Sequence, residues 1–331
     1  MKLNEDIALI NTKTGEIQEL DPGDELVTER ERIARRKYMK RQEEKKRDDY
    51  AKSRELATKG DFVWTSYSSQ MPYNLYLSNG DVPIKSATIT RLIFLATFLN
   101  YDGVLVDDEI RDKTSPSYPA MTKQEIAKKL NLITRTAQRF FEEVEANGIL
   151  TQANGKWRLS SKYFFKGKVD KDDVMSQAQQ NIYIIRAYKT AIRSLYRQAT
   201  VSSHSTLGYL FQIIPFVNRA YNIVCFNPRE RDFDKILPMT VGEFADILGY
   251  DRTQASRLYH ILRYPHCKTS NGSFRMIRYV SGEEWGKEYF YMFVNPRIYY
   301  AGNNWSKVEA LGVFDNRTDN KINYKERKNL K

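Results

Sequence analysis

The chain has 331 residues, and its 53 Lys and Arg outnumber its 41 Asp and Glu to give a formal net charge of +12. A positive excess of this size attracts polyanions, so nucleic acid and anionic membranes are the first partners to consider. No apolar run approaches the roughly 18 residues that a bilayer span requires, and the N-terminus has no apolar signal segment. We therefore expect about two domains in a protein of the bacterial cytoplasm, with no membrane partner.

Common catalytic and metal-binding patterns are missing from the sequence. Cys225 and Cys267 form no CxxC pair, and the three His lack the spacing of a structural zinc site. No GxxxxGK[ST] loop is present to bind a nucleoside triphosphate, and no His pair stands near a Tyr for metal-dependent DNA nicking. We expect no enzymatic activity, no cofactor and no metal ion.

The N-terminal region, residues 1–84, is predicted to form a small hairpin followed by a charged helical arm. Apolar runs at 7–10 and 16–20 flank a turn that contains Gly15. From Glu29 to Glu55 basic and acidic residues dominate with few apolar side chains, as in an exposed helix. This arm is either simply solvated or lies near DNA, and the sequence leaves both open.

An internal repeat is the most informative feature of the chain. Residues 87–140 align with residues 205–258 without a gap at an offset of 118, and 13 of the 54 positions are identical. Since a period of this length greatly exceeds that of solenoid repeats, each copy is expected to be a domain with its own core.

Each copy contains the pattern of a helix-turn-helix. Thr122 and Glu125, like Thr240 and Glu243, have the spacing of a capping box at the start of a first helix. A short turn separates that helix from a second one, which is typical of helix-turn-helix units. The second helices are expected at 134–147 and 252–263.

A polar hairpin follows each pair of helices. Asn154-Gly155 in copy one and Asn271-Gly272 in copy two are strong hairpin signals, and a helix-turn-helix followed by a basic hairpin is a winged helix. Toward the end of the copies the offset grows to 135, so copy two holds 17 additional residues, expected as a longer wing. We predict a mainly α protein with small β wings, in which two tandem winged helix-turn-helix domains are joined by a long helix. The expected parts are the N-terminal region (1–84), the first winged-helix domain (85–170), a basic amphipathic linker helix (171–203), the second winged-helix domain (204–303) and a basic C-terminal tail (304–331).

The two copies also end in related segments. Copy two closes with Val294 to Gly302, and copy one carries Ser160-Ser161 where copy two has Asn295-Pro296. Together with the preceding elements, this ending resembles the RepL-type winged-helix replication proteins of Firmicute plasmids and their phages, over about residues 85–170 and 205–303. The resemblance implies replication initiation or its control on a mobile element, with host or phage replication proteins as further partners.

Candidate DNA-binding residues follow from the way a winged helix docks. The start of the second helix enters the major groove, where Arg pairs with guanine and Gln with adenine, while the wing contacts the DNA backbone. The helix candidates are Thr134, Arg135, Thr136, Gln138 and Arg139 in copy one and Arg252, Thr253, Gln254, Ser256 and Arg257 in copy two. The wing candidates are Lys156, Arg158, Lys268, Arg275 and Arg278. The linker row of Arg186, Lys189, Arg193 and Arg197 either follows a phosphate strand or is merely solvated.

The sequence therefore predicts a protein that binds a specific site on double-stranded DNA, as a replication initiator or origin-binding factor of a plasmid or phage. A winged-helix transcription regulator of a mobile element, repressor or activator, is the alternative. A third hypothesis treats the copies as protein-interaction modules without specific DNA binding. The sequence leaves open whether the protein forms a homodimer and whether both copies contact DNA.

Overall fold

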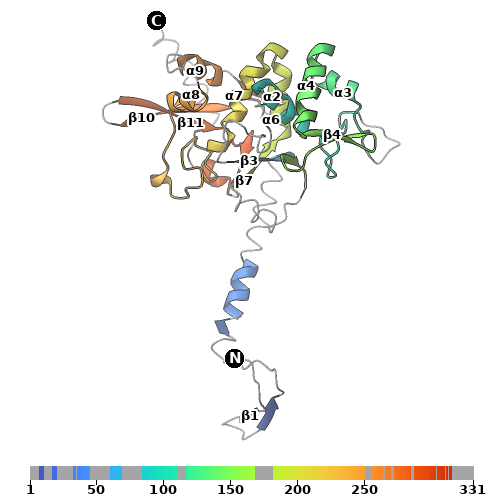
Figure 1. The fold of residues 1–331 in the computed structure, drawn as a ribbon. Helices are drawn as coiled ribbons and strands as arrows, with labels where there is room; N and C mark the ends of the chain where they lie inside the picture. Colours follow the sequence, from blue (N-terminus) through green and yellow to red (C-terminus); the bar gives the residue numbers. More distant parts are fainter. Residues whose placement is uncertain are drawn as a thin grey trace. The chain divides into compact units, whose positions relative to one another are not determined.

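A computed structural model of the chain describes residues 7–10, 17–20, 33–34, 36–44, 60–68, 84–110, 117–167, 182–249, 255–263, 265–269, 272–284, 287–302, 304–309, 311 and 313–314. The chain divides into two compact units, Met1–Glu55 and Leu56–Lys331 (Figure 1).

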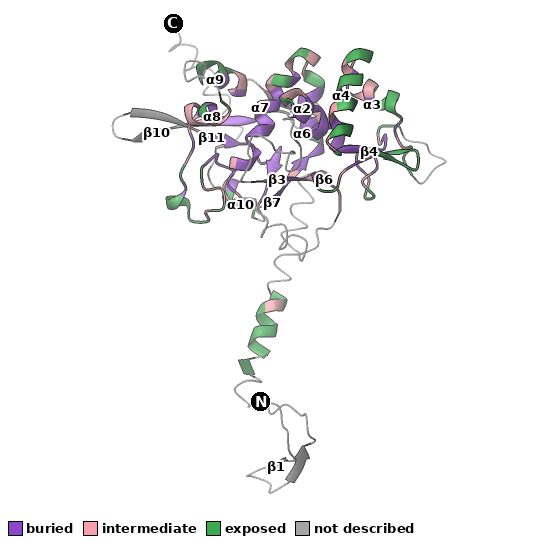
Figure 2. Cartoon of the chain, viewed as in Figure 1, coloured by how far each residue is buried: buried purple, intermediate pink, exposed green. Residues whose placement is uncertain are grey.

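The first unit contains the predicted hairpin. Strands β1 (Ile7–Ile10) and β2 (Ile17–Leu20) pair antiparallel, with Ile7 opposite Leu20. This pairing confirms the hairpin that the sequence predicts. Residues 36–44 are helical and their side chains are almost all exposed (Figure 2).

The second unit is built on a four-stranded antiparallel sheet with the strand order β12-β7-β3-β6. Its strands are β3 (Phe62–Ser68), β6 (Phe164–Phe165), β7 (Ile182–Tyr188) and β12 (Tyr299–Tyr300). The labelled helices α2, α3, α4, α6, α7, α8 and α9 lie on one side of this sheet (Figure 1). The helices are α2 (Ser86–Ala96), α3 (Lys123–Lys129), α4 (Thr134–Ala146), α6 (Lys189–Gln198), α7 (His204–Gln212), α8 (Val241–Ile247), α9 (Ala255–Arg263) and α10 (Ser306–Glu309), with 3₁₀ turns η1 (Val201–Ser203), η2 (Ile214–Phe216) and η3 (Phe233–Lys235).

The repeat found in the sequence is a repeat in the structure. Helices α2 and α7 begin 118 residues apart, and so do α3 and α8. The capping boxes are also alike, because Glu125 and Glu243 each accept a 2.7 Å hydrogen bond from the backbone N–H of the N-cap threonine three residues earlier. These contacts confirm both predicted capping boxes.

The turn that follows α7 in copy two has one more residue than the turn that follows α2 in copy one. The backbone N–H of Val106 donates to the carbonyl oxygen of Phe98, whereas in copy two Cys225 donates to Phe216. Phe98 and Phe216 keep the offset of 118, so the structural partner of Val106 is Cys225 and not Val224. The gapless alignment is therefore one residue out of register here, and the match of Val106 with Val224 does not reflect equivalent positions in the structure.

The predicted hairpin of copy one is confirmed. Strands β4 (Leu150–Ala153) and β5 (Lys156–Leu159) pair antiparallel across Asn154 and Gly155. Both turn residues have positive φ, 52° for Asn154 and 71° for Gly155, as a type I′ turn requires.

In copy two the additional residues form more than a longer wing. Strands β10 (Ile277–Glu284) and β11 (Lys287–Val294) make a long hairpin. It is equivalent to β4–β5, because Met292 accepts a backbone hydrogen bond from Val224 as Trp157 does from Leu105. Strands β8 (His266–Thr269) and β9 (Gly272–Arg275) form a second hairpin inserted before it. Gly272, at the start of β9, thus belongs to the insertion and not to the wing, whereas Asn271 lies outside the described residues.

The two copies share one hydrophobic core. A single buried cluster includes Leu92 and Phe141 of copy one, Leu210 and Phe244 of copy two, and Ile185 of the central sheet (Figure 2). The predicted fold class, a mainly α protein with two tandem winged-helix domains, is therefore wrong. The second unit is a mixed α/β structure with several small antiparallel sheets, and its two copies do not have separate cores.

The predicted long linker helix is also wrong. Residues 182–188 form strand β7, and helix α6 begins at Lys189. Ile182, Ile185 and Ile192 stand at helical spacing in the sequence, but the buried run 183–185 lies in a central strand covered on both faces. Such a strand shows no polar alternation, so its sequence resembles that of a buried helix. Residues 171–181 of the predicted helix lie outside the described residues.

Candidate nucleic-acid interface

Helix α4 presents the start of the predicted recognition surface in copy one. Its apolar face, with Ala137, Phe140, Phe141 and Val144, is buried in the core. The opposite face of its N-terminal half is open: Thr134, Arg135, Gln138 and Arg139 are exposed and Thr136 is half-buried. The structure therefore places the five predicted residues of this helix at or near one surface.

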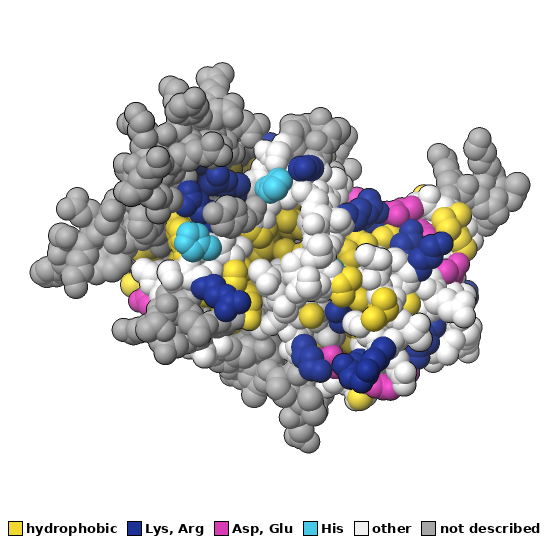
Figure 3. Space-filling view, turned by 90° about the horizontal axis from the view of Figure 1, so that it is seen from above, with side chains coloured by type: hydrophobic (Ala, Val, Ile, Leu, Met, Phe, Trp, Pro, Cys, Tyr) yellow, Lys and Arg dark blue, Asp and Glu magenta, His cyan; other side chains and the backbone are white. Residues whose placement is uncertain are grey.

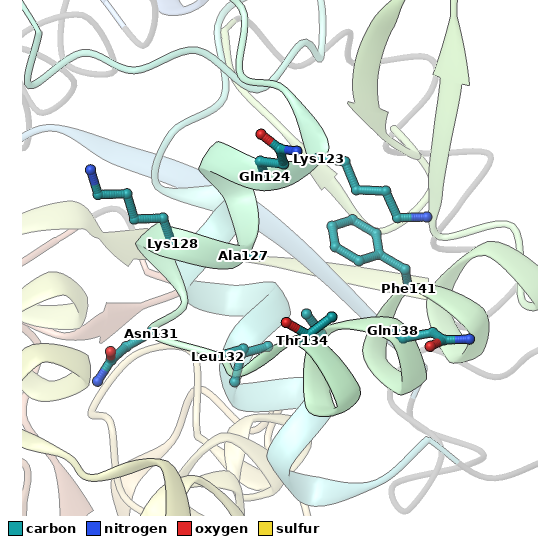
Figure 4. Close-up of a pocket in the computed structure, with 10 residues that line it drawn as sticks. Lys123, Gln124, Ala127, Lys128, Asn131, Leu132, Thr134, Gln138 and Phe141 are labelled. Atoms are coloured by element: carbon teal, nitrogen blue, oxygen red, sulfur yellow. The ribbon is translucent and has the colours of Figure 1, made fainter.

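A shallow hollow runs between α3 and α4 beside these residues (Figure 4). It is lined by Lys123, Gln124, Ala127, Lys128, Asn131, Leu132, Thr134, Ala137, Gln138 and Phe141. Lys128 and Asn131 extend from one end of it in Figure 4. Gln124, Lys128 and Asn131 were not among the predicted site residues, although the exposed Gln124 and Lys128 stand four residues apart on α3 and share its face.

The two arginines of α4 have no ion-pair partner among the described residues. Glu143 and Glu145 of the same helix instead contact residues of other elements. Glu143 accepts hydrogen bonds from the Lys85 backbone N–H at 2.9 Å and from Thr88 Oγ1 at 2.7 Å, so it caps the start of α2. Glu145 pairs with Lys123 at 3.1 Å. The positive charge at the N-terminal half of α4 therefore stays available to a partner.

Gln138 is exposed but already held. Its Nε2 donates to Glu142 Oε1 at 2.9 Å, one turn further along α4. This bond fixes the amide on the outer face of the helix.

The two cations of the copy-one wing differ in their contacts, because Lys156 has no ion-pair partner among the described residues whereas Arg158 has a contact within the fold. Lys156 is exposed next to the Asn154-Gly155 turn. Arg158 is half-buried, and its Nη1 donates to the backbone oxygen of Asp102 at 2.8 Å, which ties the hairpin to the turn after α2. Lys156 therefore remains a phosphate candidate, whereas Arg158 has a structural contact of its own.

Copy two presents fewer of its predicted residues. Ser256 and Arg257 on α9 are exposed, and so is Lys268 on the inserted hairpin. Arg278 is 7% exposed and cannot reach a phosphate group without moving, and Arg275 is half-buried. Arg252, Thr253 and Gln254 lie outside the described residues.

The predicted basic row of the linker is used within the fold, which corrects the hypothesis of a surface row along a phosphate strand. Lys189 Nζ lies 2.8 Å from Asp61 and 3.0 Å from Asp108. Arg193 contacts Asp108 at 2.8 Å, and Arg197 pairs with Glu109.

Two further observations agree with this internal role. Burial alone raises the pKa of Glu109, but hydrogen bonding and charge from Lys129 and Arg197 outweigh it and lower the pKa below its usual value. Arg186 donates to the backbone oxygen of Gly302 at 2.7 Å and lies 4.5 Å from the Trp64 ring centre. The row therefore stabilises contacts between segments that are distant in the sequence.

Among the described residues, the helix side of the second unit shows no continuous basic stripe. Figure 3, which looks onto this side, shows Lys and Arg side chains in several separate groups divided by polar and apolar surface. The described Lys and Arg of this face therefore form local groups and not a uniform track.

Other chemistry finds little support in the described part of the chain. None of the helices there is long and apolar enough to cross a bilayer. Cys225 and Cys267 are buried and unpaired with each other, and burial raises the pKa of Cys225 to about 12, so its thiolate is scarce near neutral pH.

Comparison of the chain with protein-family models, with curated proteins and with solved structures finds no match.

Proposed function

We propose that this protein binds double-stranded DNA at a specific site, with the first turns of α4 and α9 directed into the major groove. The observation that carries this proposal is the pair Arg139 and Arg257. They occupy equivalent positions of the repeat, both are exposed, and neither has an ion-pair partner among the described residues. Arg at such a position can donate two hydrogen bonds to one guanine.

The surroundings of α4 support this docking. The N-terminus of a helix carries partial positive charge, which favours the approach of phosphate. Lys128 on α3, which precedes α4 in the sequence, and Lys156 on the hairpin that follows it are both exposed and supply further positive charge. Residues of this kind position a protein on the DNA backbone while the helix contacts the bases.

We further propose that the bound site is a replication origin of a plasmid or phage. The support is the resemblance of the repeated unit and of its closing segment Val294 to Gly302 to RepL-type replication proteins. In this role the protein marks the origin and recruits replication proteins that supply the enzymatic steps.

The variant Arg139→Ala with Arg257→Ala tests both parts of the proposal. Each change is expected to cost about 1–3 kcal/mol of binding free energy and to relax base preference if that Arg pairs with a guanine. Gel shifts on a DNA site selected from random duplexes measure the loss of affinity. Origin-dependent replication in a host measures the effect on replication. Lys235→Ala is the matched control, because Lys235 is 72% exposed and lies outside both helix-turn-helix units.

The outcomes separate the candidate functions. Loss of both binding and replication supports an initiator. Loss of binding with replication intact and a reporter gene deregulated supports the transcription regulator instead. Unchanged affinity of the double variant contradicts the proposed docking of α4 and α9, and the absence of any site-specific binding by the unmodified protein contradicts the DNA-binding proposal as a whole.

A further inference from the structure

We infer that the DNA site is an imperfect inverted repeat and that one chain binds both of its halves. This inference rests on the proposed DNA binding and adds the symmetry, the spacing and the stoichiometry of the site.

The central sheet relates the two copies by an approximate two-fold rotation. Strands β3 and β7, which precede copies one and two, pair antiparallel, with Phe62 opposite Tyr188 and Ser68 opposite Ile182. The closing strands complete the symmetry, since β6 of copy one pairs with β3 and β12 of copy two pairs with β7. Equivalent antiparallel neighbours in one sheet are related by rotation about an axis perpendicular to that sheet, not by translation along the chain.

This axis points the two helix-turn-helix units in the same direction. Figure 1 shows α3 and α4 at one end of the helix layer and α8 and α9 at the other, with α2 and α7 between them, all on the same side of the sheet. The antiparallel strands of duplex DNA give it two-fold axes perpendicular to its length. A protein with two-fold related recognition helices therefore matches half-sites in inverted orientation.

Helix α6 fixes the distance between the two units. Tyr196 Oη donates to the backbone oxygen of Leu130, at the end of α3, at 3.0 Å. Ser194 Oγ donates to the backbone oxygen of Lys268, in the inserted hairpin of copy two, at 2.8 Å. One helix thus holds both copies, and the spacing of the half-sites is expected to be strict.

Close packing of α2 on α7 adds to this rigidity. A Cβ on Gly208 of α7 would lie 2.3 Å from the backbone oxygen of Ser86, so the backbones meet directly. The shared core also leaves no separate cores that can move apart.

The half-sites cannot be identical, because the exposed residues of α4 and α9 differ. Arg139 and Arg257 are equivalent and predict a guanine at the same place in both halves. Gln138 of copy one corresponds to Ser256 of copy two, and these side chains favour different neighbouring bases. Both half-sites are therefore expected to contain the guanine and to differ at the base next to it.

Selection from a library of random duplexes, with the full-length chain as bait, tests the inference. We expect enriched sequences with two inverted, non-identical half-sites at one fixed spacing, bound as a complex of one chain per duplex. Enrichment of direct repeats, of a single half-site, or of a perfect palindrome bound by two chains would overturn the inference while leaving specific DNA binding in place. Failure to enrich any sequence would instead refute the proposed function itself.

Single variants then assign each copy to its half-site. Arg139→Ala should lose about tenfold or more in affinity and become insensitive to replacement of the guanine in one half, while replacement in the other half still weakens binding. Arg257→Ala should show the reverse pattern, and Lys235→Ala should behave as the unmodified protein. If both arginine variants respond to the same guanine, the two copies do not occupy separate half-sites and the inference fails.

Spacing provides an independent readout. Insertion of about 5 base pairs between the halves turns one of them to the opposite side of the duplex, and insertion of about 10 restores the side but lengthens the site by about 34 Å. Both insertions should remove the contribution of one half-site. Recovery of full affinity with the longer insertion would show that the copies move independently, contrary to the inference.

Discussion

Two basic helices of this protein differ in what faces them. Arg135 and Arg139 on α4 stand four residues apart and have no ion-pair partner among the described residues. Lys189, Arg193 and Arg197 on α6 have the same spacing, yet all three pair with acidic side chains. The spacing of a basic row therefore says little about its role, which depends on the acids that the fold brings opposite it.

This difference divides the positive charge of the chain between folding and binding. The acids opposite α6 are Asp61, which directly precedes β3, and Asp108 and Glu109 in the loop after α2, so the ion pairs of α6 hold distant segments together. Arg135 and Arg139 of α4 have no such partner among the described residues, so their charge is available to the proposed DNA partner. If this division holds, removing an acid opposite α6 should lower stability far more than removing an acid of α4.

Asp108→Ala should cause the largest loss of stability. Asp108 contacts both Lys189 and Arg193, whose side chains are 9% and 14% exposed, and its removal leaves buried positive charge under-compensated. Breaking such a pair costs about 3 kcal/mol in the free energy of unfolding. Urea denaturation measures this quantity. Glu142→Ala on α4 is the matched control, and since its exposed partner is Gln138 we expect a change within about 0.5 kcal/mol. Equal effects of the two changes would remove the distinction between the helices.

His204, at the start of α7, is buried against the apolar face of α6. We expect the free energy of unfolding to depend on pH through this side chain. This imidazole is 1% exposed and lies against the Tyr196 ring at 4.5 Å between ring centres. Burial, and to a lesser degree the charge of Arg91, lowers the pKa of His204 to about 4. The unfolded chain takes up the proton near pH 6.5, while the folded protein does so near pH 4. The stabilisation is therefore complete above pH 6.5 and falls with decreasing pH, by about 2 kcal/mol at pH 5.

Urea denaturation between pH 7 and pH 5 checks this expectation, with His204→Gln as the comparison. The lowered pKa values of Asp61 and Glu109 place their titration below this window, so these carboxylates do not account for a loss above pH 5. If the unmodified protein and the variant show the same pH dependence, His204 is not its source.

Local features of the fold could be predicted from the sequence, because neighbouring residues determine them. Thr122 with Glu125 makes a capping box within four residues, and Asn154-Gly155 sets a turn by its own backbone preferences. The exposure of Arg139 follows from the helical period of α4 alone. These parts of the candidate site needed no knowledge of distant contacts.

The central sheet and the role of α6 could not be predicted in this way. Strand β7 lacks polar alternation because it is covered on both faces, and its partner β3 lies over a hundred residues earlier in the chain. The acids that neutralise Lys189, such as Asp61, are equally distant in the sequence. Long-range pairing of this kind leaves no periodic trace, so the sequence predicts a helix where the structure has a strand and a surface row where it has ion-paired side chains.

The helix caps of the two copies have the same geometry, so we expect their removal to cause equal and smaller losses of stability. Thr122→Ala and Thr240→Ala each remove a side chain that accepts the Glu N–H at 3.3 Å and donates to the Glu carboxylate at 2.8 Å. Each should cost about 1 kcal/mol in the free energy of unfolding. Serine at either position should restore most of the loss. Clearly unequal losses would show that one helix-turn-helix unit depends less on its first helix than the other.

The smallest effect that we expect separates a cation available to DNA from an exposed cation that is already paired. Lys156→Ala should reduce the slope of log affinity against log salt concentration by about 1, because each phosphate contact releases a condensed counterion. Arg197 is 54% exposed and by exposure alone is an equal candidate, but its charge is compensated by Glu109. Arg197→Ala should therefore leave the slope unchanged. A reduced slope for Arg197→Ala would mean that DNA displaces Glu109 from this arginine, and α6 would then share in binding.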